Sequence, residues 1–198
     1  MPPRRPRADA ARNAALLLAA AGELFAERGP DVPLDEIAKR AGVGNATLYR
    51  NFPTREDLLI AVYADEVEAL RRRGAELASA SPDEALYLWL DDFVGHVATK
   101  RDLAMAITET PDGRRSALFH EWHATLNETA EVLAARARRV GTLRDDITVI
   151  DLLALVSGGA MTTGDPDAAR RLLRLVRDGL EPRRDRTPAG THGQGSDG

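Results

Sequence analysis

The side chains best suited to chemistry stand close together between positions 45 and 50. Asn45, Thr47, Tyr49 and Arg50 can all form hydrogen bonds, and in a helix they point outward when Leu48 points inward. A helix of this size fits the major groove of DNA, where Arg can recognise guanine and Asn can recognise adenine. The same pattern also fits a helical hairpin whose polar face is only solvated, so these residues alone leave both interpretations open.

Two short helices must position this polar face. They are predicted over Leu34–Ala41 and Asn45–Asn51, and Gly42-Val43-Gly44 separates them, with Gly42 suited to a turn of positive φ. A preceding amphipathic helix ends at Gly29-Pro30. The pair packs against that helix through apolar residues at suitable spacing, namely Ile37, Ala38, Ala41, Val43, Leu48 and Phe52. The three segments together predict a helix-turn-helix unit.

Charge is unevenly distributed along the chain. A net charge of −4 over 198 residues and a pI near 5.6 argue at first against a nucleic-acid partner. Residues 1–60, however, carry a balance of +1, which leaves −5 for the remainder. Arg4, Arg5, Arg7 and Arg12 are opposed only by Asp9 at the start of the chain. This basic arm suits a phosphate backbone, although a solvated tail has the same composition.

Composition argues against several other classes of protein. The absence of cysteine excludes disulfides, a thiol nucleophile and a thiolate zinc site. No apolar run approaches the roughly 20 residues that cross a bilayer, so no membrane partner is expected. Arg4–Arg12 followed by Ala14–Ala21 resembles a signal peptide, but helical spacing continues past any cleavage point to Arg28. We therefore expect a cytoplasmic protein.

The whole chain has the spacing of helices, which predicts an all-α fold of about nine helices. Thr54, with Asp57 three residues later, predicts the capped start of a long helix that reaches about Ala78. Later helices are predicted from Ser81, over Leu103–Thr108, over Arg114–Arg139, over Ile147–Val156 between an Asp146 cap and Gly158-Gly159, and over Ala169–Leu180 after Asp165-Pro166-Asp167. Residues 181–198 have the composition of a disordered tail.

Three stretches carry a resemblance to a known family. Glu23–Gly29, Leu34–Gly42 and Thr47–Glu56 with Leu58 resemble the N-terminal domain of the tetracycline-repressor (TetR/AcrR) family of transcriptional regulators. The resemblance covers roughly residues 12–65. It implies a three-helix DNA-binding domain over residues 1–54 and a larger helical domain over residues 55–180 that dimerises and holds a ligand.

The resemblance also implies roles for single residues. Thr47 and Tyr49 would bind phosphates, and Asn45, Ala46 and Arg50 would face base edges. Contacts to the flanking backbone or minor groove would come from basic residues outside this helix: Arg55, Arg12 and the arm Arg4, Arg5 and Arg7. Gly44 is also counted among the DNA-contacting residues. Three positions depart from the family pattern: Gly44 and Pro33 lack the hydroxyl that often stands there, and Asn45 replaces a residue that is often basic.

The second domain contains candidates for a ligand cavity and a dimer interface. Apolar residues with a few polar groups between the middle helices are typical of a small-molecule site, and core packing is the alternative for each: Trp89, Phe93, His96, Met105, Thr108, Phe119, Trp122, His123 and Leu126. The last two helices have more apolar surface than one chain needs to cover. A homodimer would bury it through Leu152, Leu155, Val156, Leu172 and Val176, unless intrachain packing does so.

An enzyme is not expected. His120 and His123 are three residues apart, whereas the zinc-protease motif needs a spacing of four, and no further ligand is evident. The sequence offers no catalytic triad, paired carboxylates or phosphate loop, and no cofactor is expected. The favoured hypothesis is a ligand-responsive regulator, most often a repressor in this family, that binds a palindromic double-stranded operator. The alternative is a helical small-molecule-binding protein or enzyme with a vestigial helix-turn-helix.

Overall fold

The fold is made of helices packed along one another, as the sequence predicts. The computed structural model describes residues 6–107, 114–163 and 165–180. Within these ranges it contains no strand, and its helices are α1 (Pro6–Arg28), α2 (Leu34–Ala41), α3 (Asn45–Asn51), α4 (Arg55–Leu77), α5 (Pro82–Ala106), α6 (Arg114–Arg139), α7 (Val149–Thr163) and α8 (Pro166–Leu180). The expected tail over residues 181–198 lies outside the described residues.

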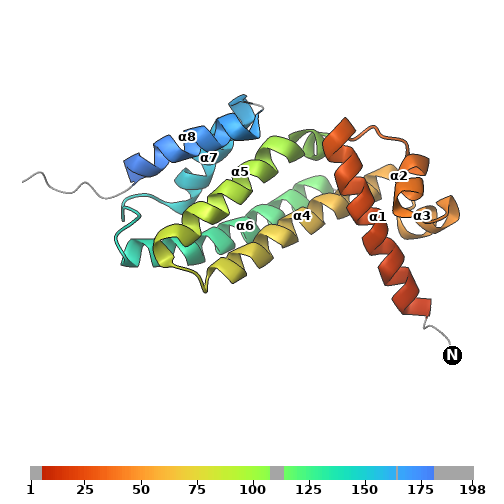
Figure 1. Ribbon diagram of the computed structural model, residues 1–198, viewed down its shortest axis with the longest axis horizontal. Helices are drawn as coiled ribbons and strands as arrows, with labels where there is room; N and C mark the ends of the chain where they lie inside the picture. The colour runs from red at the N-terminus through yellow and green to blue at the C-terminus, as the bar shows by residue number, and fades with distance from the viewer. Residues whose placement is uncertain (1–5, 108–113, 164, 181–198) are drawn as a thin grey trace, which may run out of the picture.

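The helices form two groups along the longest axis of the molecule (Figure 1). α1, α2 and α3 lie at one end, and α4 leads away from them into a bundle with α5 to α8. Buried residues nonetheless form one continuous core from Leu17 in α1 to Leu180 in α8. Packed side chains therefore connect the first three helices with the bundle.

α4 begins as its capping motif predicts. The Asp57 main-chain N–H donates to Thr54 Oγ1 at 3.1 Å, and the Thr54 N–H donates to the Asp57 carboxylate at 3.2 Å. This reciprocal pair satisfies two donors that the first turn of a helix leaves open. The start of the long helix is thereby fixed directly after the helix-turn-helix segment.

Several helix boundaries differ from the expected ones. Leu103–Ala106 is the last turn of α5 rather than a helix of its own, and Thr108 lies outside the described residues. α7 is capped by Thr148, whose Oγ1 accepts from the Asp151 N–H at 3.1 Å. Asp146 instead pairs with Arg144 at 2.6 Å. The expected cap at Asp146 was therefore wrong.

α7 also continues through Gly158 and Gly159 to Thr163. Each glycine costs a helix only about 1 kcal/mol relative to alanine. One face of α7 is buried through Val149, Leu152, Leu153, Val156 and Ala160. Burial of a single Leu side chain contributes about 1.5–3 kcal/mol, so this packing outweighs the local preference of the glycines.

Candidate functional site

The turn between α2 and α3 depends on one glycine. Gly42 has φ 68°, in the left-handed region that residues with a Cβ avoid, and nothing else in the turn shares this conformation. The Gly42 N–H donates to Lys39 O at 3.2 Å, and the Val43 N–H donates to Ala38 O at 3.0 Å. These bonds close α2 and redirect the chain within three residues, as a helix-turn-helix requires.

α3 is anchored by one side and exposed on the other. Leu48 is fully buried, while Asn45, Ala46, Tyr49 and Arg50 are exposed and Thr47 is half-buried. Tyr49 keeps 53% of its surface accessible although it is a large aromatic residue. Gly44, the N-cap residue, is exposed and extended at φ −75°, ψ 148°. The structure therefore brings together Gly44 and the five α3 residues that the resemblance assigns to DNA contact.

Arg50 lies against its own helix in the free protein. Its Nε donates to Ala46 O at 3.0 Å, and its Nη2 donates to Thr47 Oγ1 at 3.2 Å. Both partners are themselves on the outward face of α3. The guanidinium must leave them before it can reach a base.

Some basic residues around α3 form ion pairs between α1 and α2, and others lie near the start of the chain. Arg28 pairs with Glu36 at 2.5 Å, and Arg40 pairs with Glu23 at 3.2 Å, so these ion pairs join α1 to α2. The hydrogen bond from Arg28 holds the pKa of the Glu36 carboxyl below its usual value. Arg12 is exposed on α1. Arg4 and Arg5 lie outside the described residues, and only the backbone of Arg7 is described, within α1.

Arg55 has a structural partner that the sequence did not indicate. Its Nη1 donates to Pro30 O at 2.7 Å and to Val32 O at 2.8 Å. The side chain expected to contact a flanking phosphate therefore ties the first turn of α4 to the connection between α1 and α2. No motif in the sequence signals two main-chain acceptors 23 and 25 residues away.

A cavity of about 420 Å³ lies among α4, α5, α6 and α7. This volume is within the range of roughly 300–1,000 Å³ that is typical of small-molecule sites. Six of the predicted ligand residues line it: Phe93, His96, Met105, Phe119, His123 and Leu126. Thr108, also predicted, lies outside the described residues. The middle helices thus bring these six predicted residues around one cavity.

Trp89 and Trp122 do not line this cavity, and for both the alternative of core packing holds. Trp89 is fully buried, and its Nε1 donates to Leu70 O at 2.9 Å. Trp122 is buried behind Tyr63, with ring centroids 4.6 Å apart. Helical spacing shows that both side chains point inward, but it does not show whether a cavity or a neighbouring helix meets them.

The cavity also has lining residues that the sequence analysis missed. Tyr63 projects from α4, Arg115 from the start of α6, Asn127 from its middle and Ser157 from α7. Tyr63 stands among the apolar residues of α4, and Arg115 and Asn127 stand on the helix that supplied Phe119 and His123. An i,i+4 step from His123 leads to Asn127, which was the one available signal.

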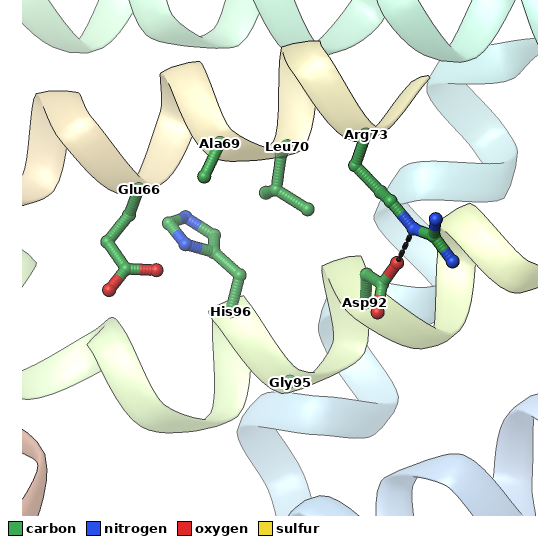
Figure 2. Close-up of a pocket in the computed structure, with 7 residues that line it drawn as sticks. All are labelled: Glu66, Ala69, Leu70, Arg73, Asp92, Gly95 and His96. Atoms are coloured by element: carbon green, nitrogen blue, oxygen red, sulfur yellow. Dashed lines mark hydrogen bonds and ion pairs between the residues drawn. The ribbon is translucent and has the colours of Figure 1, made fainter. Parts of the chain in front are cut away.

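A second hollow, of about 480 Å³, lies between α4 and α5 (Figure 2). Glu66 of α4 and His96 of α5 stand at one end of it, and Arg73 donates to Asp92 at 3.0 Å at the other. His96 lines both this hollow and the cavity. Its imidazole therefore forms part of the wall between them.

The predicted dimer residues separate into two groups. Leu152 and Val156 are buried inside the chain, so their assignment to an exposed interface was wrong, and Val176 is half-buried. Leu155 is 53% exposed and Leu172 is 40% exposed. Ile150 and Leu175, exposed by 69% and 70%, extend the apolar surface of α7 and α8 and were missed. Exposed apolar residues therefore remain on both helices, but they are a different set from the predicted one and lie beside the exposed Arg171 and Arg174 of α8.

His120 and His123 are both exposed on α6. In the part of the chain that the structure describes, no group of three or more His, Cys, Asp or Glu side chains could hold a metal ion. None of the described helices has the combined length and apolar character of a membrane span.

Comparisons with known proteins agree with this architecture. Residues 17–62 match the family described as "Bacterial regulatory proteins, tetR family", and residues 81–182 match the "Transcriptional regulator SbtR-like, C-terminal domain". Among curated proteins, the HTH-type transcriptional regulator EthR of Mycolicibacterium smegmatis is 29% identical and aligns with 75% of this chain and 70% of its own length.

Two crystal structures are more similar. A TetR transcriptional regulator from Streptomyces coelicolor is 37% identical, with a TM-score of 0.72, over 85% of this chain and 98% of that one. The TetR transcription regulatory protein from Mycobacterium vanbaalenii is 36% identical, with a TM-score of 0.72, over 90% of this chain and 100% of that one. With its helix-turn-helix at one end and its helical second domain at the other, this chain belongs to the TetR family of bacterial transcriptional regulators.

Proposed function

We propose that the protein is a dimeric repressor that binds a palindromic operator and is released from it by a small molecule. The observation that carries this proposal is the face of α3, where Asn45, Thr47, Tyr49 and Arg50 surround an exposed surface on a helix anchored by buried Leu48. Groups of these types recognise phosphates and base edges in the major groove. The proposal places the protein in the cytoplasm, together with its operator DNA.

In this proposal the α3 residues divide the work. Thr47 and Tyr49 bind phosphates and fix the register of the helix on the duplex, while Asn45 and Arg50 read bases, with Ala46 between them. Gly44, the N-cap residue, has no side chain and therefore allows the protein main chain to come close to the DNA backbone. Arg12 and the basic arm add contacts that do not depend on sequence.

Dimerisation would follow from the apolar face of α7 and α8. Ile150, Leu155, Leu172 and Leu175 are exposed there, and a second copy of the chain would bury them. A two-fold dimer places two α3 helices about one DNA turn apart, which requires a palindromic site. The division of the chain into residues 1–54 for DNA and residues 55–180 for ligand and partner belongs to the same proposal.

The cavity would hold the effector, and α4 would transmit its effect. Tyr63 of α4 lines the cavity, and Arg55, two turns earlier on the same helix, holds the main chain between α1 and α2. A ligand that binds more tightly to one position of α4 shifts the population of conformers towards it. The two α3 helices of a dimer would then lose the separation that the operator needs.

Selection of bound sequences from random duplex DNA, followed by a salt titration, tests this proposal. We expect a palindromic consensus and an affinity that falls steeply with salt concentration. Arg139→Ala, which removes an exposed cation far from α3, serves as a control and should select the same consensus. Weak binding without any enriched sequence would instead favour the alternative of a helical ligand-binding protein with a vestigial helix-turn-helix.

A further inference from the structure

The cavity among α4, α5, α6 and α7 has an unbalanced set of polar groups. Its described lining residues include one Arg and two His but no Asp or Glu. The remaining polar side chains, Tyr63, Asn127 and Ser157, can each donate a hydrogen bond without carrying a charge. Among the residues that the structure describes, the cavity therefore offers several donors and no carboxylate to repel an anion.

Arg115 is the group on which this imbalance depends. Its guanidinium carbon lies 4.7 Å from the centroid of the Phe119 ring, which orients the side chain at the cavity wall. Its Nε is buried and has no hydrogen-bond partner among the described residues. A buried donor of this kind costs free energy until an acceptor reaches it. A planar guanidinium can bind a carboxylate, as it can a phosphate, through two parallel hydrogen bonds.

Tyr63 adds a neutral donor from α4. Burial raises the pKa of the Tyr63 hydroxyl above its ordinary value, so this group keeps its proton at physiological pH. Its ring packs 5.5 Å from Phe119, measured between centroids. Tyr63 and Arg115 therefore both lie against the Phe119 ring.

The rest of the cavity wall is apolar. Phe93, Leu126, Leu153 and Met161 line it from three different helices. Such a surface gains free energy from burying a hydrocarbon or aromatic body. These apolar side chains form few hydrogen bonds with a molecule that has many polar groups.

The hollow between α4 and α5 differs from the cavity in the charge of its lining residues. It contains Glu66 and Asp92, and its one Arg, Arg73, already pairs with Asp92 (Figure 2). An anion that entered this hollow would meet two carboxylates. The preference for an anionic ligand therefore applies to the cavity and not to the outer hollow.

We propose that the effector is an apolar monocarboxylate, with its carboxylate on Arg115 and its apolar body among the aromatic and aliphatic residues of the cavity. This rests on the proposed function, in which the cavity is the effector site. The recognised chemistry is one negative charge joined to an apolar body.

Matched probes test this assignment. Decanoate should bind at least about tenfold more tightly than decanamide, and 2-naphthoate at least about tenfold more tightly than 2-naphthamide. Each amide keeps the shape of its acid but loses the charge. Binding can be followed by calorimetry and, for decanoate and decanamide, by tryptophan fluorescence, since Trp122 packs against Tyr63 and Phe119. Arg115→Gln should remove the preference for carboxylates, and Arg139→Gln, on the same helix, should keep it.

Two outcomes would overturn the assignment: amides that bind as tightly as the acids, or no binding of either acid below about 1 mM. Sequence-selective DNA binding, measured on the same protein without probes, separates these results from a failure of the proposed function. A palindromic consensus together with equal affinity for acids and amides would leave the regulator in place and exclude the carboxylate effector.

Discussion

Nη1 of Arg55 lies 2.7 Å from the main-chain oxygen of Pro30, so the first turn of α4 is joined directly to the connection between α1 and α2. The same nitrogen also donates to Val32 O at 2.8 Å. The Arg55 side chain thereby joins α4, which lines the cavity, to the segment that precedes α2. This contact gives the DNA-binding unit a defined orientation before any operator is present.

The role of Arg55 can be separated from phosphate binding with Arg55→Met. The variant keeps the apolar stem but leaves two partly buried carbonyls without their donor, so the free energy of unfolding of the DNA-free protein should fall by about 1–3 kcal/mol. Urea unfolding without DNA measures this change. Arg71→Met, which removes an exposed cation of the same helix, should change stability by no more than about 0.5 kcal/mol. Unchanged stability of Arg55→Met would leave phosphate contact as the main role.

Arg50 supplies a prediction about specificity. Arg50→Ala should weaken binding to the selected operator by about 1–3 kcal/mol and relax the preference at one base position, because a side chain that reads a base contributes to both. The free protein should lose little stability, since the two bonds of Arg50 are exposed. Repeating the selection with the variant gives the measurement. An unchanged consensus at unchanged affinity would remove Arg50 from the set of base-reading residues.

Gly74 allows α4 and α6 to approach each other. A Cβ added there would lie 2.2 Å from Cγ2 of Thr129, and the Thr129 hydroxyl is held by Thr125 O at 2.8 Å. Gly74→Ala should therefore destabilise the protein by about 1–3 kcal/mol, despite the better helix propensity of alanine.

Thr129→Ser is the matched test of that cause, because it deletes Cγ2 and keeps the hydroxyl. In the Thr129→Ser background, Gly74→Ala should cost nothing, or even stabilise by up to about 1 kcal/mol through helix propensity. Thermal or urea unfolding of the four proteins completes the double-mutant cycle. Equal losses in both backgrounds would show that the close approach to Thr129 is not the cause.

The helix-turn-helix could be predicted from sequence because each of its parts has a local signal. Gly42 marks the left-handed turn, Thr54 and Asp57 mark the capped start of α4, and Leu48 sets the phase of α3. The contact of Arg55 with Pro30 and Val32 lacks such a signal, since it depends on how separate segments meet. The resemblance assigned Arg55 to a phosphate contact and therefore missed its structural role.

The second domain was less predictable for two physical reasons. In the first half of α7, Val149–Val156, every residue but Asp151 is apolar, so the sequence pattern does not fix which side is buried, and Leu152 was assigned to the wrong face. In α5 and α6 the pattern shows which residues point inward, but a cavity and a close helix contact look alike. His96 and Trp89 both follow this pattern, and only His96 lines the cavity.

The apolar face of α7 and α8 gives the last prediction. Leu155→Glu combined with Leu175→Glu places two charges per copy in the proposed interface, and each buried unpaired charge costs several kcal/mol. We expect the dissociation constant of the dimer to rise at least about 100-fold, so that the variant is a monomer at micromolar concentration in sedimentation velocity. Val132→Glu, an equally exposed apolar position on α6, should leave the dimer intact. A dimer that survives the double substitution would require another interface and another spacing of the two α3 helices on the operator.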